Sequence, residues 1–190
     1  MARIPVRTID NAPEAAQPLL VTAEKNNGYL PNLLGVLANA PAALEAYLTL
    51  SGINARSSLS LAEREVVQIT AAATHGCGFC VAGHTAIAYK KADLPSDTVN
   101  ALRGLSSVPD ERLQAVAVFT KAVIARRGRV DEREIDAFKS AGFSDQAALE
   151  VVLGVSLATL CNFANNLGQP PLNAQLEPYR WSGESVSATS

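Results

Sequence analysis

The amino-acid sequence predicts an all-α protein, and three observations lead to this prediction. Apolar residues recur at helical spacing along most of the chain. Alternating β-branched runs joined by hairpin turn pairs are missing. Hydrophobic residues make up 48% of the chain but aromatic residues only 5%, so alanine, leucine and valine supply most of the apolar surface, as suits closely packed helices. We therefore expect a bundle of roughly eight helices.

Proline, glycine and one capping motif delimit the helices of the first half. Pro31 and Pro41 suit first-turn positions, and Ser60 with Glu63 fits a capping box. Gly76 interrupts the apolar pattern and is expected to end a helix. These signals predict helices over about 12–26, after Pro31, over 41–55, between Ser60 and Gly76, and over about 77–91.

Acidic and hydroxyl residues mark the later helices, because their side chains can accept the free amide hydrogens of a first turn. The expected starts are Ser96 or Asp97, Asp110, Asp131 and Ser144, with helices that end near Leu102, Val123, Gly142 and Ala164. We expect a turn over 165–171 and a disordered tail over 182–190, where the residues are small and polar. The length suggests one domain, which we place at 1–181.

The charge pattern argues against nucleic acid as a partner. The 16 basic and 18 acidic residues are well mixed and give a net charge of −2. The one basic cluster, 126–129, lies at an expected helix end, where cations complement the helix dipole; a nucleic-acid contact is the less favoured interpretation. No apolar run resembles a signal core or a membrane span, so we expect a cytoplasmic protein with no membrane partner.

The segment with the clearest chemistry holds Cys77, Cys80 and His84. A Cys-x-x-Cys pair can cycle between two thiols and one disulfide, and a histidine one turn further can move the proton that this cycling requires. If Gly76 separates two helices, both cysteines lie in the first turn of the second, where free amides and the helix dipole favour a thiolate. We therefore expect a lowered cysteine pKa, with Phe79 pointing away from the sulfurs and shielding them.

Helix-hairpin geometry suggests Glu65 as a fourth residue of this site. If the helices that flank Gly76 pack antiparallel, Glu65 and His84 differ in axial height by roughly 4–5 Å, which a glutamate side chain can span. Glu65 could then orient His84, as the acid of a catalytic triad orients its histidine. Glu63 points to another face of the same helix, which favours Glu65.

Other interpretations of these residues remain open. The cysteine pair could be structural, and a zinc site would combine it with His84 and either Glu65 or His75, although the sequence holds no second ligand pair. His75 could equally be a helix C-terminal residue with no chemical role. Cys161 lies in the last apolar helix, where a buried inert thiol is favoured over a third redox centre.

Taken together, these residues resemble the core of a known family. The pattern Glu, eleven residues, Cys-x-x-Cys, three residues and His, over 65–84, resembles the AhpD-like alkylhydroperoxidases of the carboxymuconolactone decarboxylase superfamily. Weaker similarity over 29–32 and 162–170 resembles the longer, peroxidase-related members of that group. The spacing of four residues is more specific than a Cys-x-x-Cys pair alone.

The resemblance implies an AhpD-like helical bundle that assembles into a homo-oligomer, a trimer or a hexamer. It also implies thiol peroxidase or disulfide reductase chemistry without metal, haem, flavin or another cofactor. By analogy, Cys80 would attack the peroxide as a thiolate, Cys77 would resolve the resulting sulfenic acid, and His84 and Glu65 would form the proton relay, with His84 acting through a water. An external dithiol, unknown in identity, would then reduce the disulfide.

The chain departs from the family pattern at Phe79. The best-studied AhpD proteins have a second relay histidine at that position, between the two cysteines. His75, two residues before the first cysteine, is the candidate replacement.

The sequence thus leads to the hypothesis of an antioxidant oxidoreductase that reduces organic hydroperoxides. Two alternatives stay open. A decarboxylase-type lyase would use His84 and Glu65 as acid and base on a carboxylated lactone, although that branch is expected to lack the cysteine pair. A non-enzymatic redox sensor would form its disulfide without turnover.

Overall fold

A computed structural model describes residues 2–183, and these residues form helices without any strand. The all-α prediction is therefore confirmed. Two 3₁₀ segments, η1 (Glu14–Ala16) and η2 (Ala174–Tyr179), lie near the two ends of the described chain. The α-helices are α1 (Gln17–Asn27), α2 (Asn32–Leu37), α3 (Pro41–Asn54), α4 (Leu61–Thr74), α5 (Gly78–Lys90), α6 (Ser96–Arg103), α7 (Glu111–Arg126), α8 (Glu132–Ser140) and α9 (Asp145–Gly168).

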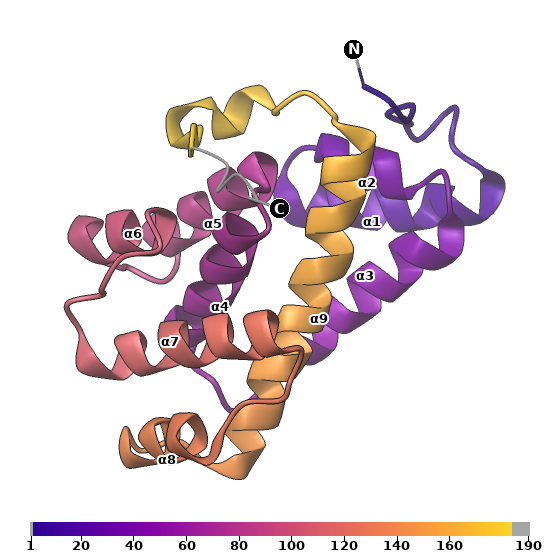
Figure 1. The fold of residues 1–190 in the computed structure, drawn as a ribbon. Helices are drawn as coiled ribbons and strands as arrows, with labels where there is room; N and C mark the ends of the chain where they lie inside the picture. The colour runs from indigo at the N-terminus through magenta and orange to yellow at the C-terminus, as the bar shows by residue number, and fades with distance from the viewer. Residues whose placement is uncertain (1, 184–190) are drawn as a thin grey trace, which may run out of the picture.

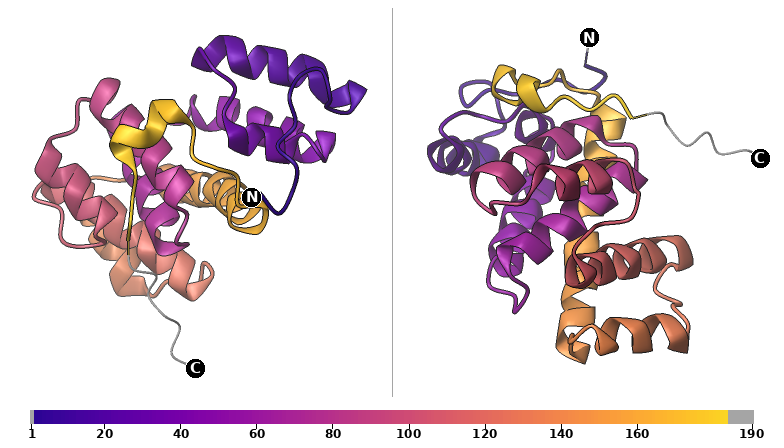
Figure 2. Two further views of the ribbon diagram at one scale, coloured as in Figure 1. Left: turned by 90° about the horizontal axis from the view of Figure 1, so that it is seen from above. Right: turned by 90° about the vertical axis from the view of Figure 1, so that its left-hand side faces the viewer.

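The long helix α9 runs through the middle of the molecule (Figure 1). The N-terminal helices α1–α3 lie on one side of it, and α4–α7 lie on the other, as the view from above also shows (Figure 2). α9 contacts α2 and α3 in the first group and α4, α5 and α7 in the second. It therefore joins a small N-terminal core to the larger core that α4, α6, α7 and α8 build.

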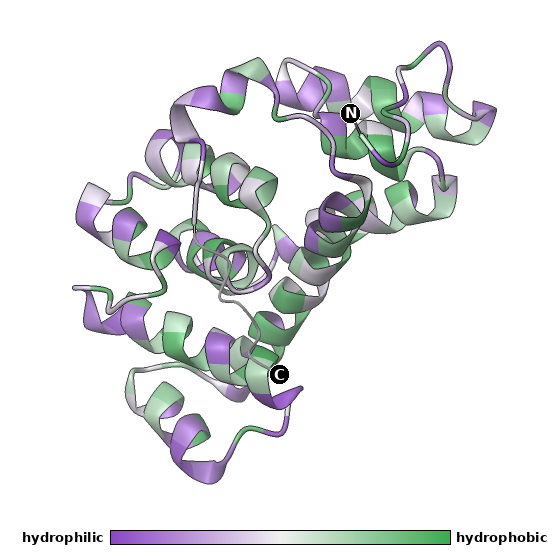
Figure 3. Ribbon diagram, turned by 45° about the horizontal axis from the view of Figure 1, so that its top comes forward, coloured by the Kyte–Doolittle hydropathy of each residue, from purple (hydrophilic) through white to green (hydrophobic). Residues whose placement is uncertain are grey.

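α9 is long and apolar enough to cross a membrane by length and composition alone. Hydrophobic residues occupy much of its length (Figure 3). One side of α9 nevertheless packs closely on the protein. A Cβ on Gly154 would lie 2.9 Å from Cγ1 of Val67, so glycine allows α4 and α9 to approach. α9 therefore contributes to the core along this side, while apolar residues on another side stay exposed.

The helical hairpin of α4 and α5 follows directly from local sequence signals. The Ser60 side chain accepts a hydrogen bond from the amide of Glu63, and the Glu63 carboxylate accepts one from the amide of Ser60, so the predicted capping box begins α4. Gly76 has φ +67°, which glycine adopts without steric cost, and it ends α4. The two helices then pack side by side.

The basic cluster has a structural role at the end of α7. Arg126 lies in the last turn, and its guanidinium forms ion pairs with Asp131 at 3.5 Å and Glu134 at 3.1 Å. These contacts link α7 to the start of α8. The geometry thus supports the interpretation that the basic cluster 126–129 marks the end of a helix.

Three helix boundaries differ from the prediction. The turn predicted over 165–171 is wrong for its first part, because α9 continues to Gly168, where a Cβ would lie 2.7 Å from Val36; the chain leaves the helix at Gln169. α1 begins later than expected, at Gln17, after the 3₁₀ segment η1. α6 is capped by neither Ser96 nor Asp97, since both lie inside its first turn. The predicted disordered tail, 182–190, falls outside the described residues except at 182 and 183.

Candidate active site

The cysteine pair lies at the start of α5. Cys77 is the N-cap residue, and its sulfur accepts a hydrogen bond from the amide of Cys80 at 3.3 Å. Both side chains are buried, and all three cysteines of the chain are free thiols. The sequence therefore brings Cys77 and Cys80 together as predicted, within one helical turn.

His84 and Glu65 form a hydrogen-bonded pair between α5 and α4. The distance from Nδ1 of His84 to Oε2 of Glu65 is 2.8 Å. Because the carboxylate accepts from Nδ1, the lone pair of the neutral ring lies on Nε2. The Glu65 side chain is 7% exposed and the His84 side chain 23%. The carboxylate is therefore the more deeply buried partner, and its hydrogen bond fixes the orientation of the imidazole ring. Glu63 instead pairs with Arg112 at 2.7 Å and caps α4, as its predicted orientation requires.

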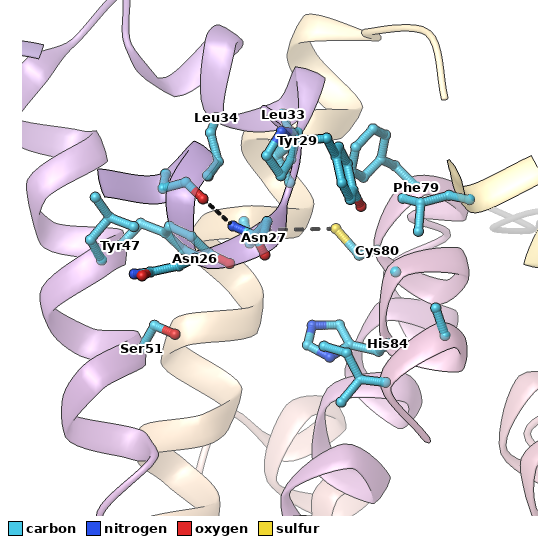
Figure 4. A pocket seen from close by; sticks show the side chains of 18 of the residues that line it. Asn26, Asn27, Tyr29, Leu33, Leu34, Tyr47, Ser51, Phe79, Cys80 and His84 are labelled. Carbon is cyan, nitrogen blue, oxygen red and sulfur yellow. Dashed lines mark hydrogen bonds between the residues drawn. The ribbon is translucent and has the colours of Figure 1, made fainter. Parts of the chain in front are cut away.

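A cavity of about 600 Å³ opens beside this pair (Figure 4). Cys80 and His84 face it from α5, one turn apart, while α1, α2 and α3 supply the opposite wall. Cys77 does not line it. The lining is mostly apolar, and it includes Tyr29, Leu33, Leu34, Tyr47, Leu48, Phe79, Ile87, Cys161 and Leu176.

Cys161 and Tyr47 also belong to this site. The sequence analysis did not single out Tyr47, and it favoured a buried inert thiol at Cys161. The sulfurs of Cys161 and Cys80 are 3.9 Å apart. Tyr47, from α3, packs against the same cluster of buried thiols. Both residues come from helices distant in sequence, so only the packing of α3 and α9 on α5 reveals them.

A family model matches the segment that holds this geometry. Residues 41–121, which include the cysteine pair, His84 and Glu65, match the model of the carboxymuconolactone decarboxylase family. The matched segment is less than half of the chain, and over it the chain is similar to the carboxymuconolactone decarboxylase family. No curated protein matches the chain.

Solved structures share the AhpD-like fold over nearly the whole chain. One is a peroxidase-related protein with an alkylhydroperoxidase AhpD core from Ralstonia eutropha JMP134, with 22% identity, TM-score 0.82 and coverage of 92% of this chain and 94% of that one. Another is a peroxidase-related protein from Silicibacter sp. TM1040, with 18% identity, TM-score 0.77 and coverage of 94% of both chains.

A third solved structure is a variant of the debrominase Bmp8 in complex with 2,3,4-tribromopyrrole. It shows 18% identity and a TM-score of 0.75, and the match covers 93% of this chain and 94% of that one. The AhpD-like fold is therefore found in proteins described by different activities.

The surroundings of Cys77 and Cys80 raise the pKa of both thiols. Burial and the hydrogen bond with Cys161 raise the pKa of the Cys80 thiol, and hydrogen bonds with Cys77 and Asn162 oppose this rise only in part. The hydrogen bond with Cys80, together with burial, raises the pKa of Cys77. The predicted lowering of the cysteine pKa is therefore wrong for the dithiol state, because the loss of water outweighs the helix N-terminus.

His75 lies behind the cysteines and does not line the cavity that holds Cys80. Its Nδ1 is 3.0 Å from Oδ1 of Asn162, and its backbone carbonyl accepts a hydrogen bond from Asn166 at 2.8 Å. Asn162 thus connects His75 to Cys80, which it also contacts. The sequence placed Asn162 in the last helix and Asn166 in a turn, and it gave neither residue a role at the site.

Phe79 occupies the position of the relay histidine in the best-studied AhpD proteins. It lines the cavity and packs near Leu176 of η2, so it forms part of the cavity wall. Within residues 2–183, no group of three or more His, Cys, Asp or Glu side chains has the arrangement of a metal site.

Proposed function

We propose that this AhpD-like chain is a thiol-dependent hydroperoxide reductase. The observation that supports this function best is the combination of two adjacent thiols with the 2.8 Å hydrogen bond between Glu65 and His84, where Cys80 and His84 line a cavity of about 600 Å³. Such an arrangement supplies a nucleophile, a base that can activate it and a group that orients the base.

Proton removal from Cys80 begins the proposed reaction. Because burial raises the pKa of this thiol, it needs a base, and Nε2 of His84 can accept the proton through a water in the cavity. The Glu65 carboxylate then stabilises the imidazolium. The Cys80 thiolate attacks the terminal oxygen of the hydroperoxide and the O–O bond breaks. The proton held by His84 goes to the leaving alkoxide, so the products are a sulfenic acid on Cys80 and an alcohol.

Cys77 resolves the sulfenic acid in the second step. Its thiol sulfur attacks the Cys80 sulfur, the S–O bond breaks, and the hydroxide leaves as water with the thiol proton. The product is a Cys77–Cys80 disulfide. An external dithiol restores both thiols by two exchange reactions and becomes a disulfide itself.

The cavity favours organic hydroperoxides over hydrogen peroxide. Its volume of about 600 Å³ suits a molecule with a sizeable carbon skeleton, and most of its lining is apolar. Apolar lining groups stabilise such a skeleton by removing its surface from water.

The first experiment is a thiol count by mass spectrometry before and after one equivalent of cumene hydroperoxide. We expect two thiols to be lost as a Cys77–Cys80 disulfide in the wild-type protein, with dithiothreitol restoring them. Cys80→Ser should consume no peroxide. Three thiols unchanged in the wild-type protein would contradict the proposal.

Turnover separates the proposal from the two alternatives. A redox sensor would form the disulfide once and show no continued peroxide consumption with a dithiol. A lyase that depends on His84 and Glu65 would keep its activity on a carboxylated lactone after both Cys77 and Cys80 are replaced by serine.

A second candidate is reductive debromination by the same dithiol, and the fold similarity to the debrominase Bmp8 favours it. Two thiols would supply two electrons, replacing bromine on an aromatic ring with hydrogen and releasing bromide. Incubation with 2,3,4-tribromopyrrole and dithiothreitol tests it: bromide release that disappears in Cys80→Ser would support this reaction.

A further inference from the structure

Cys161 lies beside the reactive thiol, on the side that faces the cavity. Its sulfur is 3.9 Å from the Cys80 sulfur, and both residues line the cavity. Cys77 also lies next to Cys80, but it is fully buried and does not reach the cavity. Cys80 therefore has two thiol neighbours, Cys77 and Cys161.

We propose that Cys161 is a second resolving thiol, which forms an alternative Cys80–Cys161 disulfide when Cys80 is oxidised. The inference rests on the proposed hydroperoxide reduction. It adds a third redox residue, from α9, to the pair on α5.

Each step of this alternative route balances. An organic hydroperoxide oxidises the Cys80 thiol to a sulfenic acid and leaves as an alcohol. The Cys161 sulfur attacks the Cys80 sulfur, the S–O bond breaks, and the hydroxide leaves as water with the Cys161 proton. The S–S bond requires the sulfurs to move from 3.9 Å to about 2.05 Å, which side-chain rotation and a small shift of α9 can provide.

A Cys80–Cys161 disulfide would be more accessible from the cavity than a Cys77–Cys80 disulfide. Both of its sulfurs would face the cavity, so a small dithiol that enters the cavity could attack either of them. In the Cys77–Cys80 disulfide only one sulfur belongs to a cavity-lining residue. A nearby second thiol would also consume the sulfenic acid before a further peroxide oxidises it to the sulfinic acid.

Trypsin digestion distinguishes the two disulfides. Cys77 and Cys80 lie in one tryptic peptide, 65–90, whereas Cys161 lies in another, 140–180. A Cys77–Cys80 disulfide is therefore internal to one peptide, and a bond to Cys161 joins two peptides. The experiment treats the wild-type protein, Cys77→Ser, Cys161→Ser and the double variant with one equivalent of cumene hydroperoxide, with dimedone present to trap sulfenic acid.

We expect Cys77→Ser to give the joined peptides 65–90 and 140–180 and to continue peroxide consumption with dithiothreitol. Serine can replace Cys77 as the N-cap acceptor, so this variant should retain the fold. The double variant should lose the joined peptides and give dimedone-labelled Cys80. In the wild-type protein, a minor joined pair that disappears in Cys161→Ser would be a second line of support.

The outcomes separate this inference from the proposed function. Dimedone-labelled Cys80 without joined peptides in Cys77→Ser, together with a Cys77–Cys80 disulfide in the wild-type protein, would overturn the role of Cys161 and leave the peroxidase intact. Three unchanged thiols in the wild-type protein would overturn both.

Discussion

At the scale of single residues, the pair of His84 and Glu65 is the feature on which the proposed chemistry most depends. A buried thiol with a raised pKa reacts slowly unless a base removes its proton. We expect His84→Ala to lower peroxide consumption by about 10²–10⁴-fold, the usual contribution of a general base. Glu65→Gln should lower it by less, because the amide still contacts the ring but cannot stabilise the imidazolium.

The measurement for this prediction is the initial rate of peroxide consumption as a function of pH. Glu45→Gln, an exposed change on α3, is the matched control for the loss of one carboxylate. In His84→Ala we expect the rate to recover at high pH, where hydroxide can ionise the thiol. A wild-type rate at neutral pH in this variant would remove His84 from the relay.

The buried thiols also predict how stability depends on pH. In the unfolded chain Cys77 and Cys80 titrate near their ordinary pKa of 9.0, whereas the folded protein keeps both protons to higher pH. Above that pKa the unfolded state holds fewer protons than the folded state, so the free energy of unfolding falls as pH rises, by up to about 1.4 kcal/mol per pH unit for each thiol.

Denaturant unfolding between pH 7 and 10.5, in the presence of a reductant, measures this dependence. Replacing both Cys77 and Cys80 by serine should make the decline shallower, because serine does not titrate in this range. Equal slopes in the wild-type protein and the double variant would contradict the raised pKa values.

At the scale of helices, Gly154 controls how closely α9 approaches α4. A Cβ at this position would lie 2.9 Å from Val67, inside the contact distance of carbon atoms. We expect Gly154→Ala to lower the free energy of unfolding by about 1–3 kcal/mol, the typical cost of overpacking. Urea unfolding provides the measurement.

Gly52→Ala is the matched control. Gly52 lies inside α3, and nothing lies within 4 Å of the Cβ that alanine would add. This change should raise the stability by about 0.5–1 kcal/mol, because alanine loses less backbone freedom than glycine in a helix. A loss of stability at both positions would mean that close packing is not the cause.

The helices that the sequence predicted well are those with local signals. The capping box at Ser60, the caps at Asp110, Asp131 and Ser144, and the break at Gly76 act within one or two turns, so they can be read without the fold. The last turn of α9 was missed, because its asparagine and glycine residues are typical of turns. Contacts made elsewhere in the fold, such as Asn166 with His75 and Gly168 with Val36, favour the helix there.

The same distinction applies to the site. Glu65, Cys77, Cys80 and His84 lie within one hairpin, and their spacing along two adjacent helices could be worked out from helix geometry. The neighbours Tyr47 and Cys161 come from helices distant in sequence, so no local sequence pattern predicts their place at the site. The raised pKa of the thiols also depends on burial by these distant helices, which explains why the helix N-terminus alone gave the wrong direction.

At the scale of the whole molecule, one face of α9 is the clearest surface for assembly. Leu149, Val152, Phe163 and Leu167 are exposed, and helical spacing puts them on one stripe. Leu149 is 71% exposed and Leu167 is 64% exposed. Such a stripe is typical of a contact between subunits, so we expect the homo-oligomer that the family resemblance implied to form through it.

Light scattering coupled to size-exclusion chromatography tests this expectation. Replacing both Leu149 and Leu167 by glutamate should lower the measured mass, because two buried charges would oppose the contact. Val21→Glu, at a similarly exposed site on α1, should leave the mass unchanged. A wild-type protein that is monomeric at micromolar concentration would contradict the expected assembly.

The cavity combines two parts of the chain with different tasks. The candidate reactive groups come from the hairpin of α4 and α5, with Cys161 of α9 beside Cys80, while α1–α3 supply the opposite wall. Side chains on that wall can therefore be exchanged without altering the spacing of Glu65, His84 and the cysteines. If the proposed thiol chemistry holds, substrate preference is separable from it, and changes to α1–α3 would redirect the proposed reductase to a different organic molecule.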